Sequence, residues 1–271
     1  MKLDFCKYHG LGNDFLLMDD PDGGLLPLLS AAKIRLLCDR HIGIGADGIL
    51  VRQRSEKADH CMILFNADGS RAEISGNGLR CFVLLLRDKG YDVSRELTIE
   101  TGGGIQRAAL MQDGTVETTM PLPQFREGGT PTPLKLEARG KTFHVLPISV
   151  GNPHGVIFGF ERDITFAETY GPPLEKHQAF PEGANIEFVH VLSDRACKLV
   201  VWERGAGITQ ACGSGSTATA AAGAALGHFV FDAPIAVHQP GGTLEITVAK
   251  DFREIRQRGP ATFVFEGHIV L

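Results

Sequence analysis

Two side chains that can carry a proton stand in the same setting in the two halves of the chain. Ser75 is followed by Gly-Asn-Gly and Cys212 by Gly-Ser-Gly, and an apolar or small-residue run comes after each. This pattern predicts that a helix starts at each site, where backbone N–H groups are unpaired and the helix dipole is positive. Such a helix start binds carboxylates and lowers the pKa of a thiol, so we expect Cys212 to be partly thiolate at neutral pH.

These properties suit the removal of the weakly acidic α-proton of an amino acid, because aimed N–H donors stabilise charge that develops on carboxylate oxygens. If the two helix starts face each other across a cleft between domains, one side chain removes a proton from one face of Cα. The other then returns a proton on the opposite face. The pattern indicates inversion at Cα without a cofactor, with Ser75 and Cys212 as the acid–base pair. The alternative for either residue alone is structural: Ser75 as a helix cap and Cys212 as a small buried side chain.

Polar residues near the two helix starts repeat in the same order. By sequence, Asn13 corresponds to Asn152, Asn66 to Glu203, and Asp47 to Asn185. A ring of amides with one glutamate and one arginine suits a zwitterion, in which Glu203 would bind an ammonium group and Arg204 would hold a second carboxylate. His154 is a candidate for an auxiliary proton-handling group. The competing interpretation places each Asn in an ordinary turn and His154 at a turn cap.

The correspondence extends along the chain. Residues 65–90 match residues 202–229, residues 12–15 match 151–154, and residues 45–47 match 183–185, all at a nearly constant offset. Three matches in the same order indicate an internal duplication, and a length of 271 residues suits two domains. We expect a first domain over residues 1–120, a linker rich in Pro and Gly over 121–133, and a second domain over 134–271 whose last strand can cross back to the first.

Helices are predicted at both glycine-rich starts and at two further places. Residues 79–86 are apolar except for Arg80, and a helix that is apolar on every face is a buried one. A helix over residues 31–40 has Ser30 as its N-cap, with Leu36 and Leu37 expected to face inward. Another covers residues 164–169 and is expected to stop at the Gly-Pro-Pro sequence that begins at Gly171.

Strand patterns fill much of the remainder. They cover residues 3–9, 14–18, 49–52, 61–66, 97–100, 106–111, 116–120, 143–150, 155–158, 186–191, 198–203, 235–238, 244–248 and 262–265. Each half is therefore mostly strand around one central helix. The predicted fold class is α+β, with two pseudo-symmetric domains that each wrap a sheet around a buried helix.

Composition narrows the classes of partner. A net charge of −5 and a pI near 6.1 give no reason to expect nucleic acid or an anionic membrane as a partner. The first ten residues lack the apolar core of a signal peptide, so the expected location is the cytoplasm. The six cysteines form no Cys-x-x-Cys pair and have no zinc-finger spacing, so we expect reduced, mostly buried thiols and no metal site.

The motifs together resemble the diaminopimelate epimerase family. They are HGLGNDF at residues 9–15, GIGADG at 43–48, FNADGS at 65–70, GNGLRC at 76–81, GNPH at 151–154, GANIEFV at 183–189 and ERGAGITQACGSG at 203–215. They follow the family's order over nearly the whole chain. The resemblance implies two similar domains, each a β-barrel-like sheet around a central helix, with the active site in the cleft between them. It also implies a homodimer.

The implied activity is interconversion of LL- and meso-diaminopimelate by two-base proton transfer at Cα, without a cofactor, in lysine and peptidoglycan synthesis. In this family a cysteine precedes each helix and acts as base or acid, and these positions are Ser75 and Cys212 here. His154 and Glu203 are implied as further catalytic residues. The implied substrate contacts are Asn13, Asn66, Gly76, Asn77, Asn152, Asn185, Glu203, Arg204, Gly213 and Ser214.

Ser75 departs from the family pattern, because a hydroxyl group is far less acidic than a thiol and is a poor base without an activating group. Three explanations stay open at this point. Ser75 is an engineered substitution that silences one base, or a natural variant with altered activity, or a sign that the protein only binds an amino acid. The altered activities that we consider are slow epimerisation, a related amino-acid racemase, and a one-base dehydratase or isomerase on the same scaffold.

Overall fold

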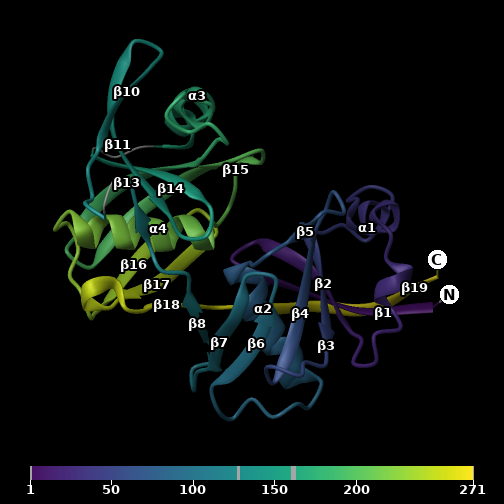
Figure 1. The fold of residues 1–271 in the computed structure, drawn as a ribbon. Helices are drawn as coiled ribbons and strands as arrows, with labels where there is room; N and C mark the ends of the chain where they lie inside the picture. Colours follow the sequence, from purple (N-terminus) through teal and green to yellow (C-terminus); the bar gives the residue numbers. More distant parts are fainter. Residues whose placement is uncertain (1, 127–128, 160–162, 271) are drawn as a thin grey trace. The chain divides into compact units, whose positions relative to one another are not determined.

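The structure is a computed structural model that describes residues 2–126, 129–159 and 163–270. The chain divides into two compact units. Unit 1 comprises Met1–Thr118 and Gly259–Leu271, and unit 2 comprises Thr119–Arg258. Figure 1 labels the elements of both units.

Unit 1 consists of strands with three short or medium helices among its described residues. In chain order these are β1 (Lys2–Gly10), β2 (Asn13–Asp19), η1 (Leu26–Leu28), α1 (Ala31–Cys38), β3 (Gly48–Gln53), β4 (His60–Asn66), β5 (Arg71–Ala72), α2 (Gly76–Asp88), β6 (Leu97–Thr101), β7 (Gly104–Leu110), the first part of β8 (Val116–Met120), and β19 (Thr262–Val270).

Among the described residues, unit 2 repeats the main strands and helices of unit 1 in the same order and adds β10 and η2. It contains β9 (Gln124–Phe125), β10 (Leu134–Ala138), β11 (Lys141–Ser149), β12 (Pro153–Gly159), α3 (Ile164–Glu175), β13 (Asn185–Ser193), β14 (Ala196–Glu203), β15 (Gly207–Ile208), α4 (Gly213–Ala225), β16 (Pro234–Gln239), β17 (Gly242–Val248), η2 (Lys250–Phe252) and nearly all of β18 (Ile255–Gly259).

Strand pairing follows the same rules in the two units. In unit 1, β2 pairs parallel with β3, β3 antiparallel with β4, β4 parallel with β6, and β6 antiparallel with β7. In unit 2, β12, β13, β14, β16 and β17 repeat this series with the same directions. The α+β class and the pseudo-symmetric pair of sheets around central helices are thereby confirmed.

The ladder registers also show which residues are equivalent, and they correct one match made from sequence. Phe15 pairs with Gly48 in unit 1, and its counterpart His154 pairs with Asn185 in unit 2. Asn185 is therefore the counterpart of Gly48, one residue beyond Asp47. The short Gly-Ala match misplaced this pair because strand pairing, and not the turn sequence, sets the register.

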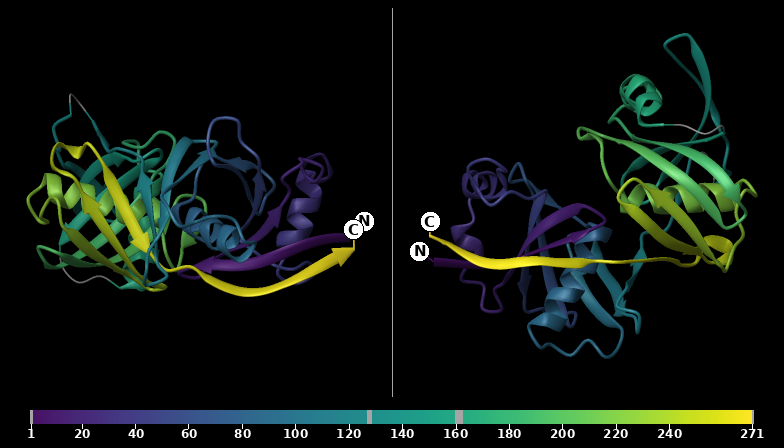
Figure 2. Two further views of the ribbon diagram at one scale, coloured as in Figure 1. Left: turned by 90° about the horizontal axis from the view of Figure 1, so that it is seen from below. Right: turned by 180° about the vertical axis from the view of Figure 1, so that it is seen from behind.

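Unit 1 is completed by a strand from the other end of the sequence, whereas the strands of unit 2 come from its own continuous segment. After β8 the chain enters unit 2, where β9 pairs with β11. After β18 the chain returns to unit 1, where β19 pairs with β1 from Lys2↔Val270 to His9↔Thr262. Figures 1 and 2 show these first and last strands, in purple and yellow, side by side. Of the segment predicted as a linker, residues 121–133, the described residues 121–126 and 129–133 belong to unit 2, and residues 127–128 lie outside the described residues.

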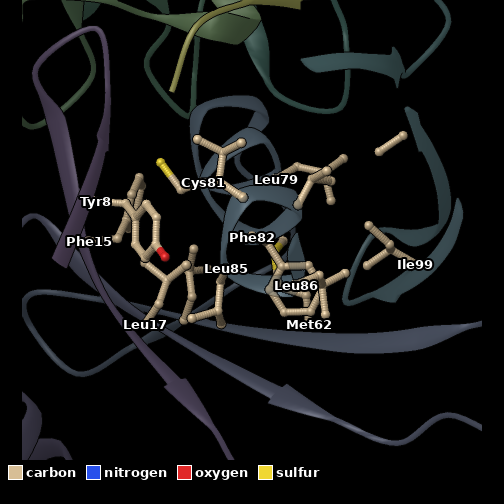
Figure 3. Packing of buried hydrophobic residues seen from close by; sticks show 14 of the residues in the cluster. Tyr8, Phe15, Leu17, Met62, Leu79, Cys81, Phe82, Leu85, Leu86 and Ile99 are labelled. Atoms are coloured by element: carbon tan, nitrogen blue, oxygen red, sulfur yellow. The ribbon is translucent and has the colours of Figure 1, made fainter. Parts of the chain in front are cut away.

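The central helix of unit 1 forms where the sequence predicts it. Ser75 is the N-cap of α2, and its side chain accepts a hydrogen bond from the Gly78 backbone. All residues of α2 from Gly76 to Leu86 are buried. Figure 3 shows why: side chains of the surrounding strands, among them Tyr8, Phe15, Leu17, Met62 and Ile99, pack around the helix. Burial of this apolar surface on every side holds the helix in place.

The central helix of unit 2 is built differently. Cys212 is the N-cap of α4, whose first turns are glycine, serine, threonine and alanine, and these residues are buried from Gly215 to Ala224. Small side chains let neighbouring segments approach the helix backbone. A Cβ atom at Gly223 would lie 2.2 Å from Cδ2 of Phe229, so this approach requires glycine.

Two helix predictions are wrong in detail. Leu36 is 41% exposed, because the buried face of α1 is formed by Ile34, Leu37 and Cys38. The helix expected to stop at Gly171 continues to Glu175, with Pro172 and Pro173 inside α3. Trp202 packs closely against this part of α3, since a Cβ atom at Gly171 would lie only 2.4 Å from its Cγ, and its Nε1 donates to Oε2 of Glu175 at the end of the helix.

Five strands were missing from the sequence prediction: β5, β9, β10, β15 and β18. Three of them are two residues long, and such short pairings leave no periodic pattern in a sequence. In the part of the chain that the structure describes, none of the helices has the length and hydropathy needed to cross a membrane.

Candidate active site

Ser75 occupies the start of α2 with an extended backbone, at φ −140° and ψ 120°. Its Oγ accepts a hydrogen bond of 3.0 Å from the backbone N of Gly78. The residue is half-buried, and Gly76, Asn77 and Gly78 behind it are buried. The hydroxyl group thus stands at the positive end of the helix with its own proton still available to donate.

A directed chain of hydrogen bonds fixes the amides beside Ser75. Nη2 of the fully buried Arg80 donates to Oδ1 of Asn77 over 2.7 Å, and Nδ2 of Asn77 donates to Oδ1 of Asn13 over 3.1 Å. Nδ2 of Asn13 then donates to Oδ2 of Asp47 over 2.8 Å. Burial lowers the pKa of Arg80 to about 10, which leaves it a cation at neutral pH. Because the groups at the two ends of this series of hydrogen bonds, Arg80 and Asp47, are both charged, each of the two amides has a single orientation.

The acidic end of that chain is held by cations. Nη2 of Arg40 lies 2.8 Å from Oδ1 of Asp47 and 2.6 Å from Oδ1 of Asp14. Nζ of Lys7 lies 2.8 Å from Oδ2 of Asp14. These ion pairs fix the turn that carries Asn13.

Asn66 has a different environment. It is exposed, and its Nδ2 donates to Oγ of Ser70 over 3.0 Å within a turn. Its ladder partner is Gly48, the counterpart of Asn185. The predicted role of Asn66 as a substrate contact remains a prediction.

Cys212 has the same place in unit 2 that Ser75 has in unit 1. Its Sγ accepts a hydrogen bond of 3.3 Å from the backbone N of Gly215 and lies 3.5 Å from Oγ of Ser214. Its own N–H donates to Oε1 of Gln239 over 2.7 Å. The residue is only 5% exposed.

The expectation of a partly ionised thiol at Cys212 is wrong for this structure. Burial raises the pKa of Cys212 well above that of an ordinary thiol, and the nearby carboxyl groups of Glu203 and Glu187 raise it further. The Gly215 N–H group acts in the opposite direction but is outweighed. Cys212 therefore rests as a neutral thiol, which is a proton donor.

Glu203, at the end of β14, lies beside this thiol. Its carboxyl group accepts a hydrogen bond from Oγ1 of Thr209, and its charge raises the pKa of Cys212. Burial raises the pKa of Glu203. The catalytic role predicted for Glu203 stays a prediction.

His154 lies on β12 with both ring nitrogens hydrogen-bonded. Nδ1 is 2.6 Å from Oε1 of Glu187, and Nε2 is 2.9 Å from Oδ1 of Asn152. His154 and Glu187 are both 0% exposed. Sequence reasoning missed Glu187, although a lone acidic residue inside the apolar strand at residues 186–191 was a usable signal.

Asn185 and Arg204 are adjacent in the structure. Oδ1 of Asn185 accepts a hydrogen bond of 2.8 Å from the Arg204 backbone N, and its Nδ2 donates to the Pro153 carbonyl over 3.4 Å. The exposed Arg204 side chain donates to the Glu182 carbonyl over 3.0 Å. Its guanidinium group keeps further donors for a carboxylate.

A cavity of about 370 Å³ in unit 2 is lined by His154 together with apolar residues such as Ile148, Pro153 and Phe180. Glu203, Arg204 and Cys212 do not line it, so it does not match the pocket expected for a zwitterion. Within residues 2–126, 129–159 and 163–270, no three acidic, His or Cys side chains gather in a group that could hold a metal ion.

Comparison with known proteins adds to this geometry. The family model described as "Diaminopimelate epimerase" matches residues 5–125 and 147–264. A diaminopimelate epimerase of Nostoc punctiforme is 40% identical over 282 residues, covering 99% of this chain and 100% of the relative. The enzyme of the same name from Desulforudis audaxviator is 40% identical over 276 residues, covering 98% of each chain.

Solved structures with low sequence identity share the fold. A probable proline racemase from Agrobacterium radiobacter has a TM-score of 0.74 at 16% identity, covering 99% of this chain and 93% of its own. A hydroxyproline epimerase from Agrobacterium vitis has a TM-score of 0.72 at 15% identity, covering 99% and 91%. A phenazine biosynthesis protein of the PhzF family from Bacillus anthracis has a TM-score of 0.71 at 19% identity and covers 100% of both chains. With the family model and the full-length relatives in agreement, this chain belongs to the diaminopimelate epimerase family.

Proposed function

We propose that this protein interconverts LL- and meso-diaminopimelate by proton transfer at Cα, without a cofactor, and that Ser75 makes it slow. The observation that supports this most directly is the matched pair of helix starts. Ser75 and Cys212 are the N-caps of α2 and α4, and each accepts a hydrogen bond from the backbone N–H three residues on. The names of the full-length relatives supply the substrate.

The proposed reaction needs the two caps to face opposite sides of one Cα when substrate is bound. The N–H groups of both helix starts would hold the α-carboxylate and stabilise the charge that develops when the Cα–H bond breaks. On the Cys212 side the neutral thiol gives its proton to the carbanion, so that the S–H bond breaks and a new Cα–H bond forms. In the reverse direction the thiol must first pass its proton to Glu203, and the resulting thiolate removes the α-proton.

On the Ser75 side the same step is difficult. The hydroxyl group can donate a proton to the carbanion, but its conjugate base is too strong to form readily at neutral pH. Proton removal from that face is therefore slow. We expect Cys212 to exchange the α-proton of one stereoisomer faster than the chain inverts the centre.

The experiment is incubation of each stereoisomer with the protein in D₂O, followed by mass spectrometry. We expect deuterium to enter the isomer whose α-proton faces Cys212, and we expect Cys212→Ala to abolish this uptake. Cys197→Ala is the matched control, because it removes another buried thiol of unit 2 and leaves Cys212 in place. Absence of uptake from both isomers would refute the proposed proton transfer.

We further propose that the protein is a cytoplasmic homodimer. In support of the location, the six cysteines are all free thiols, as is usual in a reducing compartment.

In support of the dimer, β19 pairs with β1 and exposes Phe263, Val264 and Phe265 along a nine-residue strand. A long apolar edge favours pairing with a second copy. Light scattering with Val264→Lys, which we expect to yield monomers, tests this interface.

A further inference from the structure

Gln239, the last residue of β16, lies beside the N-cap of α4 and uses only one end of its side-chain amide. Its Oε1 accepts a hydrogen bond of 2.7 Å from the backbone N–H of Cys212. Its Nε2 is buried and has no hydrogen-bond partner among the described residues. The whole residue is only 9% exposed. A buried N–H₂ group without a partner costs free energy, so the contribution of this glutamine must come from its oxygen.

The start of α4 cannot supply such an oxygen from its own residues. In a capping box, a Glu or Gln three residues after the N-cap reaches back to the backbone N–H of the N-cap. That position in α4 is Gly215, which has no side chain. A Cβ atom there would lie 3.1 Å from Oε1 of Glu187 and 3.2 Å from Sγ of Cys212, so a larger residue would crowd the thiol. Gln239 completes the capping box from β16 instead.

Unit 1 shows that the fold can form a helix start without this contact. Thr101 is the counterpart of Gln239, because Thr101 pairs with Gly104 at the end of its hairpin as Gln239 pairs with Gly242. Oγ1 of Thr101 donates to the Gly104 carbonyl over 2.7 Å, inside its own turn. The start of α2 forms all the same, with Ser75 as its N-cap. The long amide side chain therefore belongs to the unit that carries the thiol.

Two hydrogen bonds together hold Cys212. The Gln239 oxygen accepts from its backbone N–H over 2.7 Å, and the Gly215 N–H donates to its Sγ over 3.3 Å. The backbone of Cys212 is extended, at φ −117° and ψ 111°, and an N-cap residue does not donate its own N–H within the helix. The contact with Gln239 is thus what fixes the backbone end of the residue.

We propose that Gln239 is a positioning residue for the Cys212 thiol: its side-chain oxygen holds the backbone of the N-cap and thereby fixes the direction in which Sγ points. Gln239 itself does not touch the reacting atoms. This inference rests on the proposed function, in which the thiol transfers a proton to and from Cα. The position of such a group matters because a misplacement of about 1 Å can cost about 100-fold in rate.

Gln239→Leu tests this role, because it removes the oxygen and keeps a buried side chain of similar size. Gln239→Met, which keeps the length of the side chain and also has no oxygen, is a second variant with the same expected results. Gln106→Leu is the matched control, since Gln106 lies on β7 of unit 1, is 8% exposed, and undergoes the same chemical change. Melting curves define a temperature at which all of the variants are folded.

The first readout is the hydrogen bond itself, measured by NMR on protein with nitrogen-15 in its six cysteines. The Cys212 signal is identified by its loss in Cys212→Ala. A short hydrogen bond moves an amide proton downfield, so we expect this proton to move upfield in Gln239→Leu and to stay in place in Gln106→Leu. An unchanged Cys212 signal in Gln239→Leu would refute the proposal.

The second readout is the rate of deuterium uptake into diaminopimelate as a function of substrate concentration. In Gln239→Leu we expect the maximal rate to fall about 10- to 100-fold, because the thiol is misplaced. The substrate concentration at half the maximal rate should stay within about twofold of the parent's, a split that loss of folded protein would not produce. An unchanged maximal rate, or an equal fall in Gln106→Leu, would refute the positioning role.

Alkylation of Cys212 by iodoacetamide separates this inference from the proposed function, because it needs no substrate. The residue is 5% exposed in the parent. Release of its backbone in Gln239→Leu should speed alkylation about tenfold, which is the effect of one lost hydrogen bond. If the parent takes up no deuterium while alkylation is faster in Gln239→Leu, the proposed function fails and the positioning role stands. Equal alkylation rates in the two proteins would refute the positioning role in either case.

Discussion

Ser75→Cys should convert this chain into a fast epimerase. The helix start at Ser75 already has the donor that a thiolate needs, because Gly78 N lies 3.0 Å from Oγ, compared with 3.3 Å between Gly215 N and Sγ of Cys212. The residue is half-buried, so the longer C–S bond has room. Among the residues that the structure describes, no carboxyl group is hydrogen-bonded to Ser75, whereas the charge of Glu203 raises the pKa of Cys212. A thiol introduced here should therefore ionise more easily than Cys212 does.

The magnitude follows from what one positioned acid–base group contributes. That contribution is about 100- to 10,000-fold in rate. It corresponds to about 3 to 5 kcal/mol of activation free energy. The substitution also weakens an N-cap, which costs about 1 kcal/mol of folding free energy. A drop in melting temperature of about 2 to 4 °C should therefore accompany the gain in rate.

The assay follows both stereoisomers by chiral chromatography, with differential scanning fluorimetry in parallel. Ser75→Ala is the matched control and should remain as slow as the parent or slower. If the parent already turns over at about 10 per second, an ordinary enzymatic rate, the reasoning about the missing thiol is wrong. A gain below about tenfold in Ser75→Cys would refute it as well, because a general base contributes more than that.

Two further predictions concern stability. Burial raises the pKa of Asp14, but Arg40 and Lys7 outweigh burial and lower it to about 2. Since the unfolded value is near 3.9, this carboxylate stabilises the fold above about pH 4, and about 2 to 3 kcal/mol is lost as the pH falls toward 2. Urea unfolding should show this loss in the parent and a flatter acid limb in Asp14→Asn; identical limbs would contradict it. Gly171→Ala places a Cβ atom 2.4 Å from Cγ of Trp202 and should destabilise unit 2 by about 1 to 3 kcal/mol. Gly24→Ala, with nothing within 4 Å, is the control, and equal melting temperatures for the two variants would contradict the clash.

The sequence predicted best the features that depend on local chemistry. Both N-caps were found because a small polar residue before a glycine-rich start and an apolar run leaves few alternatives to a buried helix. Features set by tertiary packing were not accessible in this way. The part of α3 that contains its prolines packs against Trp202, which lies far along the sequence.

In the candidate site, too, local chemistry was predicted from the sequence and the effects of tertiary packing were not. The identities of Asn13, Asn152 and Cys212 were readable from repeated motifs, but their charge states and partners were not. The neutral thiol at Cys212 results from burial and from two carboxyl groups on neighbouring strands. Glu187 was overlooked because a single acid in an apolar strand gains meaning only when His154 is found 2.6 Å away.

The return of β19 to unit 1 bears on how the chain folds during its synthesis. Unit 2 is one continuous segment, Thr119–Arg258, and every strand it needs has left the ribosome once that segment is complete. Unit 1 begins first but finishes last, because β1 lacks β19 until the final strand emerges. During that interval the nascent chain carries an incomplete sheet whose first strand has an open edge. This segment is where a chaperone would have the most reason to bind, and where an early stop in translation would do the most damage.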